Sequence, residues 1–203
     1  HGNPTWSFFY RHLVLGLRGK YRCIVPDHIG CGLSEKPQTG FSYQLKDHIA
    51  NVVALLEHLK IERFSLVVHD WGGAIGCGVA TQMPERVRAL QVMNTAAFRS
   101  TRIPARIALC RAPLIGELMV RGLNVFAGSA TFMAATKKLS PAVKAGFLFP
   151  YNNWANRIAT HRFVVDIPTQ PAHPSYETLV EIENGLERLK HLPMHILWGG
   201  RDF

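Results

Sequence analysis

The stretch that decides the fold is Phe64-Ser65-Leu66-Val67-Val68-His69-Asp70-Trp71-Gly72-Gly73-Ala74. It begins as a short apolar run, which is typical of a strand buried on both faces. The run then meets the carboxylate of Asp70 and passes at once into Gly-Gly-Ala and a small-residue helix pattern. A strand that turns sharply into a helix, with a reactive side chain at the turn, is the layout of a nucleophile elbow. The pattern therefore predicts that Asp70 stands at the tip of such an elbow.

Helical and strand patterns alternate on both sides of this stretch. The helix before it carries apolar residues at spacings of four and three, and Ser42 is a candidate to cap its start. Such alternation predicts an α/β fold with a mostly parallel sheet and helices on both faces. The expected elements are a helix over 6–17, a strand over 21–25, a helix over 42–59, the elbow strand and its helix to about 83, and a strand over 89–93.

The alternation lapses between residues 98 and 192, where helical patterns interrupted by prolines take over. Strand character returns at 194–198, followed by Gly-Gly-Arg-Asp. An all-helical insertion between two strands predicts a cap over a site at the carboxyl ends of the strands. We therefore expect a first part of the α/β core at 1–97, a helical cap at 98–192 and a continuation of the core at 193–203.

Composition excludes several classes of protein. The chain has 203 residues, 47% of them hydrophobic, which suggests one domain or one domain with a large insertion. No apolar run reaches the roughly 18 residues of a membrane span, so we expect no transmembrane segment. The formal net charge is +9, but the basic residues are scattered and no nucleic-acid motif accompanies them. A solvated basic surface without a nucleic-acid partner is the favoured interpretation.

The four cysteines show no spacing typical of metal ligands. We expect reduced thiols in a cytoplasmic protein, with neither a disulfide nor a metal site. The glycine turn at 26–34 lacks a complete GxGxxG pattern, and Pro26 breaks the strand-to-helix context of a dinucleotide loop. The sequence therefore predicts no cofactor.

Asp70 has two interpretations. It could be an ordinary carboxylate at a helix N-terminus, where the helix dipole favours negative charge. The apolar strand before it, the Gly-Gly-Ala after it and Asp202 at the end of another strand favour a catalytic role. A carboxylate nucleophile forms a covalent ester and expels a halide, an epoxide oxygen or a lactone oxygen. Completing such a cycle normally needs a histidine oriented by an acid, and Asp202 is placed to be that acid.

Asn3 and Trp71 are the candidate anion stabilisers. The Trp indole N–H and the Asn amide are hydrogen-bond donors, and two donors aimed at one spot suit a leaving anion. The structural alternatives are a core aromatic for Trp71 and a turn residue before Pro4 for Asn3. None of the ten histidines is a convincing base, and strand alternation turns His69 away from Asp70.

Across essentially its whole length the sequence resembles the α/β-hydrolase fold, within it the haloalkane-dehalogenase-like branch. The motifs are an oxyanion loop, a glycine turn, the elbow and an acid-bearing loop, at residues 1–4, 26–34, 67–73 and 198–202. Residues 94–99, 106–111, 154–159 and 162–168 resemble the β-lactone decarboxylases of bacterial long-chain olefin biosynthesis, which convert a cis-3-alkyl-4-alkyloxetan-2-one to a cis-alkene and CO2.

The resemblance implies that Asp70 attacks the lactone ring, that Asn3 and Trp71 inherit the halide site of the dehalogenases, and that the cap holds two alkyl chains. It also implies a hydrophobic small-molecule substrate and assembly with other enzymes of the olefin pathway. The catalytic histidine of the family follows a further strand, beyond Phe203, so we expect the chain as given not to turn over. Haloalkane dehalogenation is the second hypothesis, epoxide hydrolysis the third, and a non-catalytic ligand-binding protein of the same fold the fourth.

Overall fold

A computed structural model describes residues 1–202, which fall into two units. The sheet unit comprises Gly2, Ser42–Pro104 and residues 166–202, and the helical unit comprises His1, Asn3–Phe41 and Ala105–Val165. Phe203, the last residue of the predicted third segment, lies outside the described residues. The predicted division at 97 and 192 therefore stays a prediction.

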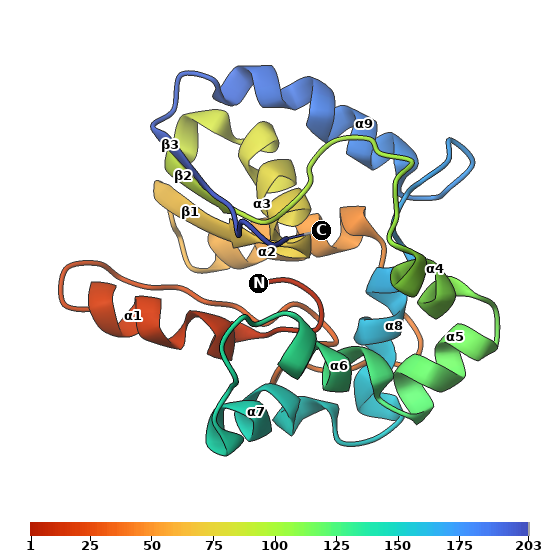
Figure 1. Cartoon of the computed structure of the whole chain (residues 1–203). Coiled ribbons are helices and arrows are strands. Elements are labelled where there is room, and N and C mark those ends of the chain that lie inside the picture. The colour runs from red at the N-terminus through yellow and green to blue at the C-terminus, as the bar shows by residue number, and fades with distance from the viewer. Residues whose placement is uncertain (203) are drawn as a thin grey trace. The chain divides into compact units, whose positions relative to one another are not determined.

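The sheet unit is built on three parallel strands in the order β1 (Phe64–His69), β2 (Val87–Met93) and β3 (Met194–Leu197), as Figure 1 shows. The register aligns His69 with Met93 and Met93 with Leu197, so the three strands end at the same level. The residues that follow these ends are therefore brought to one edge of the sheet. The predicted parallel sheet is confirmed.

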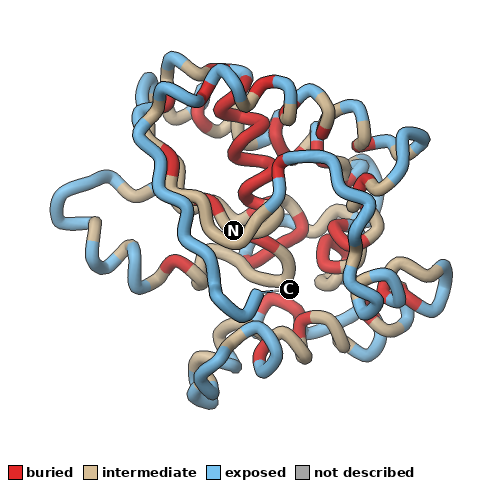
Figure 2. The backbone as a smooth tube through the Cα atoms, turned by 45° about the horizontal axis from the view of Figure 1, so that its top comes forward, coloured by how far each residue is buried: buried red, intermediate tan, exposed pale blue. Residues whose placement is uncertain are grey.

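Three helices of this unit contact one another and form one layer: α2 (Leu45–His58), α3 (Trp71–Gln82) and α9 (Tyr176–Gly185). Short 3-10 turns, η2 (Pro84–Arg86) and η6 (Leu186–Leu189), follow α3 and α9. Helix α3 packs on β1 and β2 and is the buried helix of the unit (Figure 2). Its small residues allow this, because a Cβ at Gly76 would lie 2.5 Å from Cγ1 of Val68.

The start of α2 differs from the prediction. Ser42 is not its cap, since the helix begins at Leu45 and the Ser42 hydroxyl instead accepts a hydrogen bond from the Gln44 N–H at 3.1 Å. The Leu45 N–H donates to Asp166 Oδ2 at 2.8 Å and to Ser175 Oγ at 3.2 Å, and both partners are buried. The first N–H groups of a helix have no acceptor within the helix. For the N–H of Leu45, two residues distant in sequence supply the acceptors.

The helical unit contains no strand within the residues that the structure describes. The predicted strand at 21–25 is wrong: this segment is irregular, because no neighbouring strand forms a hydrogen-bond ladder with it. The predicted helix over 6–17 is present as a 3-10 turn that continues into an α-helix. The elements are η1 (Ser7–Tyr10), α1 (Arg11–Leu17), α4 (Ala105–Arg111), α5 (Ile115–Glu117), the π-helix η3 (Leu118–Gly122), α6 (Val125–Met133), α7 (Pro141–Leu148), η4 (Phe149–Tyr151), η5 (Ala155–Arg157) and α8 (Ile158–Val165).

Between β2 and β3 the described chain forms only helices and loops, as expected for an all-helical insertion. Across residues 1–202, no helix is both long enough and apolar enough to cross a membrane.

Candidate active site

Asp70 occupies the sharp turn between β1 and α3. Its backbone has φ 51° and ψ −130°, a region that residues with side chains rarely adopt. Backbone hydrogen bonds hold this conformation: the Asp70 N–H donates to the Asn94 carbonyl at 3.1 Å, and the Gly73 N–H donates to the Asp70 carbonyl at 2.8 Å. Strained backbone that is held by its surroundings is concentrated at functional sites. The turn thus has the geometry expected of a nucleophile elbow.

Small residues make room for this turn. A Cβ at Gly2 would overlap the Asp70 side chain, and a Cβ at Gly73 would overlap Thr95. The Thr95 hydroxyl donates to the Asp70 carbonyl at 2.5 Å, so the residue that closes over Gly73 also holds the elbow. The chain therefore needs glycine at both positions for Asp70 to stand where it does.

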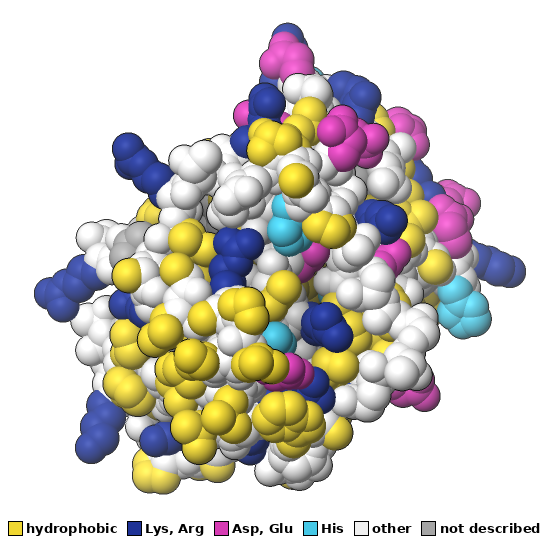
Figure 3. Space-filling view, turned by 90° about the vertical axis from the view of Figure 1, so that its right-hand side faces the viewer, with side chains coloured by type: hydrophobic (Ala, Val, Ile, Leu, Met, Phe, Trp, Pro, Cys, Tyr) yellow, Lys and Arg dark blue, Asp and Glu magenta, His cyan; other side chains and the backbone are white. Residues whose placement is uncertain are grey.

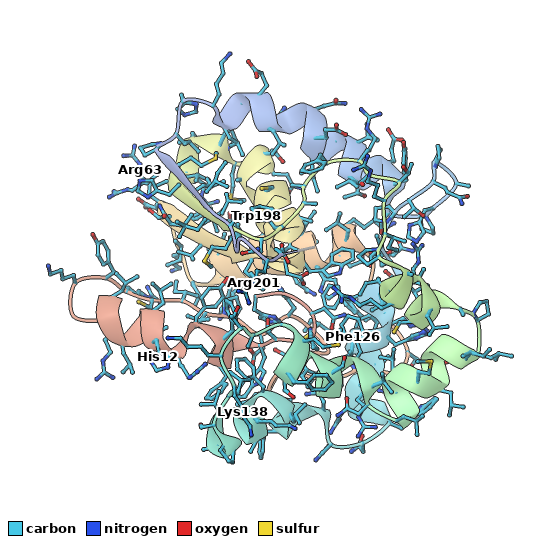
Figure 4. All side chains as sticks on the ribbon, in the orientation of Figure 1. His12, Arg63, Phe126, Lys138, Trp198 and Arg201 are labelled. Carbon is cyan, nitrogen blue, oxygen red and sulfur yellow. The ribbon has the colours of Figure 1, made fainter. Side chains whose placement is uncertain are left out.

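The acid loop, residues 199–202, follows β3 at the same edge of the sheet (Figure 4 labels Trp198 and Arg201). The Asp202 N–H donates to the Gly199 carbonyl at 3.0 Å and closes the loop into a turn. The side chain of Asn94 contacts the loop at two points: its Nδ2 donates to Asp202 Oδ2 at 2.8 Å, and its Oδ1 accepts from the Gly199 N–H at 3.3 Å. One residue therefore fixes both the loop and the direction of its carboxylate.

Asn94 also sits in a left-handed conformation, with φ 38°, which Asn tolerates better than most residues. Its carbonyl accepts the Asp70 N–H while its side chain binds Asp202. Asn94 thus connects the elbow and the acid loop through one peptide unit and one amide. The structure brings the predicted residues Asp70, Trp71 and Asp202 to one edge of the sheet unit.

His69 ends β1 directly before the elbow. Burial lowers the pKa of its imidazole, and the carboxylates of Asp70 and Asp202 act in the opposite direction. Since burial is the larger effect, the environment of this ring favours its neutral form.

The two predicted anion stabilisers lie in different units. Trp71 is the first residue of α3 and is half-buried in the sheet unit. Asn3 belongs to the helical unit, where its Nδ2 donates to the Thr160 carbonyl at 2.9 Å and its peptide bond to Pro4 is cis. Their convergence on one anion stays a prediction.

The sequence did not predict Asn94, Thr95 and Gly2 as site residues, although they lie in the stretches 94–99 and 1–4 that carry the resemblance. The available signal was position: Asn94 and Thr95 directly follow a strand that neighbours the elbow strand, where functional side chains gather in parallel sheets. Within the described part of the chain, no group of three or more His, Cys, Asp or Glu side chains is arranged to hold a metal ion.

Comparison with known proteins places these features in a family. Residues 1–142 match the model of a family described as alpha/beta hydrolase fold. A cis-3-alkyl-4-alkyloxetan-2-one decarboxylase of Shewanella oneidensis is 44% identical over 209 residues, covering 100% of this chain and 66% of the relative. A protein of the same name from Xanthomonas campestris is 41% identical over 212 residues, covering 100% of this chain and 71% of the relative. The chain thus spans about two thirds of the length of these relatives.

A solved structure shares the fold of this chain. The haloalkane dehalogenase DatA from Agrobacterium tumefaciens matches with a TM-score of 0.84 at 28% identity, covering 97% of this chain and 69% of the other. The resemblance inferred from the sequence and the predicted fold class are both confirmed.

Proposed function

We propose that this chain, which belongs to the α/β-hydrolase fold family, carries a carboxylate-nucleophile active site with Asp70 as the attacking group. The observation that carries the proposal is the strained turn at Asp70, which two backbone hydrogen bonds and two close glycines support. A carboxylate used only to cap a helix needs none of this, because capping residues adopt ordinary extended conformations.

The reaction best supported is decarboxylation of a long-chain cis-β-lactone to a cis-alkene. A carboxylate oxygen of Asp70 attacks the saturated, alkyl-bearing ring carbon that is bonded to the ring oxygen, and the bond between that carbon and the ring oxygen breaks. This gives an alkyl ester on Asp70 and a free carboxylate on the neighbouring carbon. Loss of CO2 then delivers the electron pair to a new carbon–carbon double bond and expels the Asp70 carboxylate. The atoms of this reaction balance without water. The attack inverts the configuration of the attacked carbon, and CO2 and the Asp70 carboxylate then leave from opposite faces. Together the two steps keep the alkyl groups cis.

The other residues receive supporting roles in this proposal. Asp202, held by Asn94, orients a catalytic histidine, and Trp71 and Asn3 stabilise the carboxylate released from the ring. The helical segment at 98–192 is the proposed cap that holds the alkyl chains. The resemblance to the β-lactone decarboxylases supports a role in olefin biosynthesis and assembly with other enzymes of that pathway. The four free cysteines, three of them buried, support a reducing cytoplasmic location.

Haloalkane dehalogenation is the second candidate, because the matched DatA structure carries that name and the same residues would serve a leaving halide. The two reactions differ in the use of water. A haloalkane forms an alkyl ester that only water can release, as an alcohol, whereas the lactone reaction needs none. Epoxide hydrolysis is the third candidate, and it lacks a supporting contact among the described residues.

The deciding experiment gives the protein that carries this chain a cis-3,4-dialkyl β-lactone and, separately, a 1-haloalkane, with gas chromatography of the products. Formation of cis-alkene without 3-hydroxy acid is the expected result. Halide and alcohol without alkene would replace the first proposal by the second, and hydrolysis of the lactone to the hydroxy acid would refute decarboxylation. Conversion of neither substrate would favour a binding protein. Asp70→Asn, which keeps the side-chain shape, is the control that assigns the nucleophile.

A further inference from the structure

The two units differ sharply in charge. The helical unit holds thirteen Lys and Arg against three Asp and Glu, whereas the sheet unit holds ten against eleven. Within the helical unit, Ala105–Val165 contains eight Lys and Arg and a single acid, Glu117. Glu117 pairs with Arg121 at 2.6 Å, so even this charge is compensated locally. The net positive charge of the chain thus belongs entirely to the helical unit.

The same segment exposes a group of aliphatic side chains on α4, α5 and the start of η3. Leu109, Leu114, Ile115 and Leu118 are 50%, 84%, 59% and 58% exposed, and Arg106 shares the helix face of Leu109. We call these five residues the docking face. In Figure 3, hydrophobic side chains gather over this segment with Lys and Arg among them. Soluble proteins rarely leave several large aliphatic side chains together in water.

The docking face lies beside the core of the helical unit. On α4, Ile107 and Cys110 join Val120, Val164 and Phe126 in that core (Figure 4 labels Phe126). Leu109, next to Cys110, stays exposed, and so do Leu114, Ile115 and Leu118 beyond the end of the helix. Large aliphatic side chains that continue past the buried stripe of a helix are normally covered as well. We therefore expect these side chains to have a partner.

The backbone at Leu114 supports the same conclusion. Leu114 has φ 61° and ψ −54°, and the Ile115 N–H donates to the Pro113 carbonyl at 2.7 Å. This is a γ-turn of the rare, strained form, which a glycine would adopt at lower cost. The chain instead places there a leucine that is 84% exposed. Strain that serves only to hold an aliphatic side chain in water points to a binding role for that side chain.

We infer that the docking face binds the surface of a membrane containing anionic phospholipids, with its leucines and isoleucine inserted among the lipid chains and the basic side chains at the headgroups. Interfacial helices combine aliphatic insertion with Lys and Arg attracted to anionic lipids in this way. An acidic protein partner fits less well, because protein interfaces favour aromatic anchors, and the docking face has none. The inference is independent of the catalytic proposal.

The test is co-sedimentation of the full chain with phosphatidylcholine vesicles that contain phosphatidylglycerol. The wild-type protein is expected to sediment with these vesicles, to bind pure phosphatidylcholine much less, and to be released as salt rises. Leu114→Ser combined with Leu118→Ser should weaken partitioning roughly tenfold or more. Leu33→Ser, at a side chain 70% exposed elsewhere in the helical unit, is the matched control and should bind like wild type.

Two charge-reversal variants test the electrostatic part of the inference. Arg106→Glu should weaken binding to the mixed vesicles more than Arg18→Glu, which makes the same change at an exposed position on another segment of the unit. Circular dichroism verifies that each variant is folded. Equal binding to both kinds of vesicle, no binding to either, or unchanged binding by the double leucine variant would each overturn the inference. Loss of self-association in that variant, with vesicle binding retained, would assign the docking face to a protein interface instead.

Discussion

In the sheet unit, polar groups near the elbow have defined partners: Asn94 binds Asp202 and Gly199, Thr95 binds the Asp70 carbonyl, and acids and bases are nearly equal in number. The helical unit instead carries the excess of basic residues and leaves aliphatic side chains in water. The first pattern is what chemistry at fixed positions requires, because small displacements are costly there. The second suits adhesion to a fluid surface, which tolerates imprecise contacts.

This contrast predicts that chemistry and surface binding can be lost separately. Asp70→Asn should lower kcat by roughly a thousandfold or more, because the amide is not a nucleophile, while vesicle binding stays unchanged. The Leu114→Ser, Leu118→Ser variant should lose vesicle binding. Turnover of Asp70→Asn and vesicle co-sedimentation of both variants, made in the protein that carries this chain, check this. If Asp70→Asn also lost vesicle binding, or the leucine variant kept it, the separation of chemistry and surface binding between the units would be wrong.

A second prediction concerns the stability of the sheet unit in acid. His48 is buried on α2, and burial lowers the pKa of its imidazole from 6.5 to about 4, with Asp47 opposing. The unfolded chain binds this proton near pH 6.5 and the folded chain only near pH 4. The free energy of unfolding should therefore fall as pH is lowered through this window, by up to about 3 kcal/mol, and then level off.

His48→Gln should flatten that slope, measured by urea unfolding at a series of pH values between 7 and 4. His58→Gln, an exposed position on the same helix, is the matched control and should keep it. An unchanged slope in His48→Gln would show that other groups cause the acid sensitivity.

A third prediction tests the link between elbow and acid loop. Asn94→Asp keeps the shape and tolerates the left-handed backbone, but it replaces the donor to Asp202 by a second carboxylate. We expect kcat to fall roughly tenfold to a hundredfold with KM nearly unchanged, and to recover partly at lower pH, where the shared proton restores a hydrogen bond.

Steady-state kinetics over a pH series measures this effect. Asn184→Asp, at an exposed position on α9, adds the same charge away from the edge and should leave kcat unaltered. Wild-type kcat in Asn94→Asp at all pH values would exclude a positioning role for Asn94.

The smallest expected effect concerns the distant cap of α2. Ser175 Oγ accepts from the Leu45 N–H at 3.2 Å and donates to Asp166 Oδ1 at 2.7 Å. Ser175→Ala should reduce the free energy of unfolding by about 1 kcal/mol. Ser129→Ala, which removes a hydroxyl that bonds only within its own helix, should change it less in urea unfolding. An equal loss of unfolding free energy in the two variants would show that the Ser175 contact adds no specific stability.

Local patterns were sufficient to predict most of the sheet unit. The apolar run to His69 and the small residues after Asp70 predicted β1, the turn and α3, because strand burial and helix packing both depend on side-chain size at fixed spacing. The strand expected at 21–25 failed, since a strand needs a neighbour that no local pattern reveals. Ser42 failed as a cap because acceptors from residues 166 and 175 were better placed.

The residues of the candidate site also differ in how far the sequence could predict them. Asp70 and Asp202 could be proposed from the residues around them, whereas the role of Asn94 depends on the register that aligns three strand ends. The distribution of charge between the units was also not visible along the sequence. Its basic residues occur singly, and the imbalance emerges only when they are grouped by the unit in which they fold.

The contacts that cap α2 can form only late in the synthesis of the chain. The acceptors of the Leu45 N–H lie 121 and 130 residues later in the chain, and β3 begins at Met194, long after β2 ends at Met93. A ribosome making this protein releases α2, β1 and β2 long before either partner exists. The nascent sheet unit must therefore persist without β3 and with an unfinished helix start, a period in which chaperones would find it most exposed.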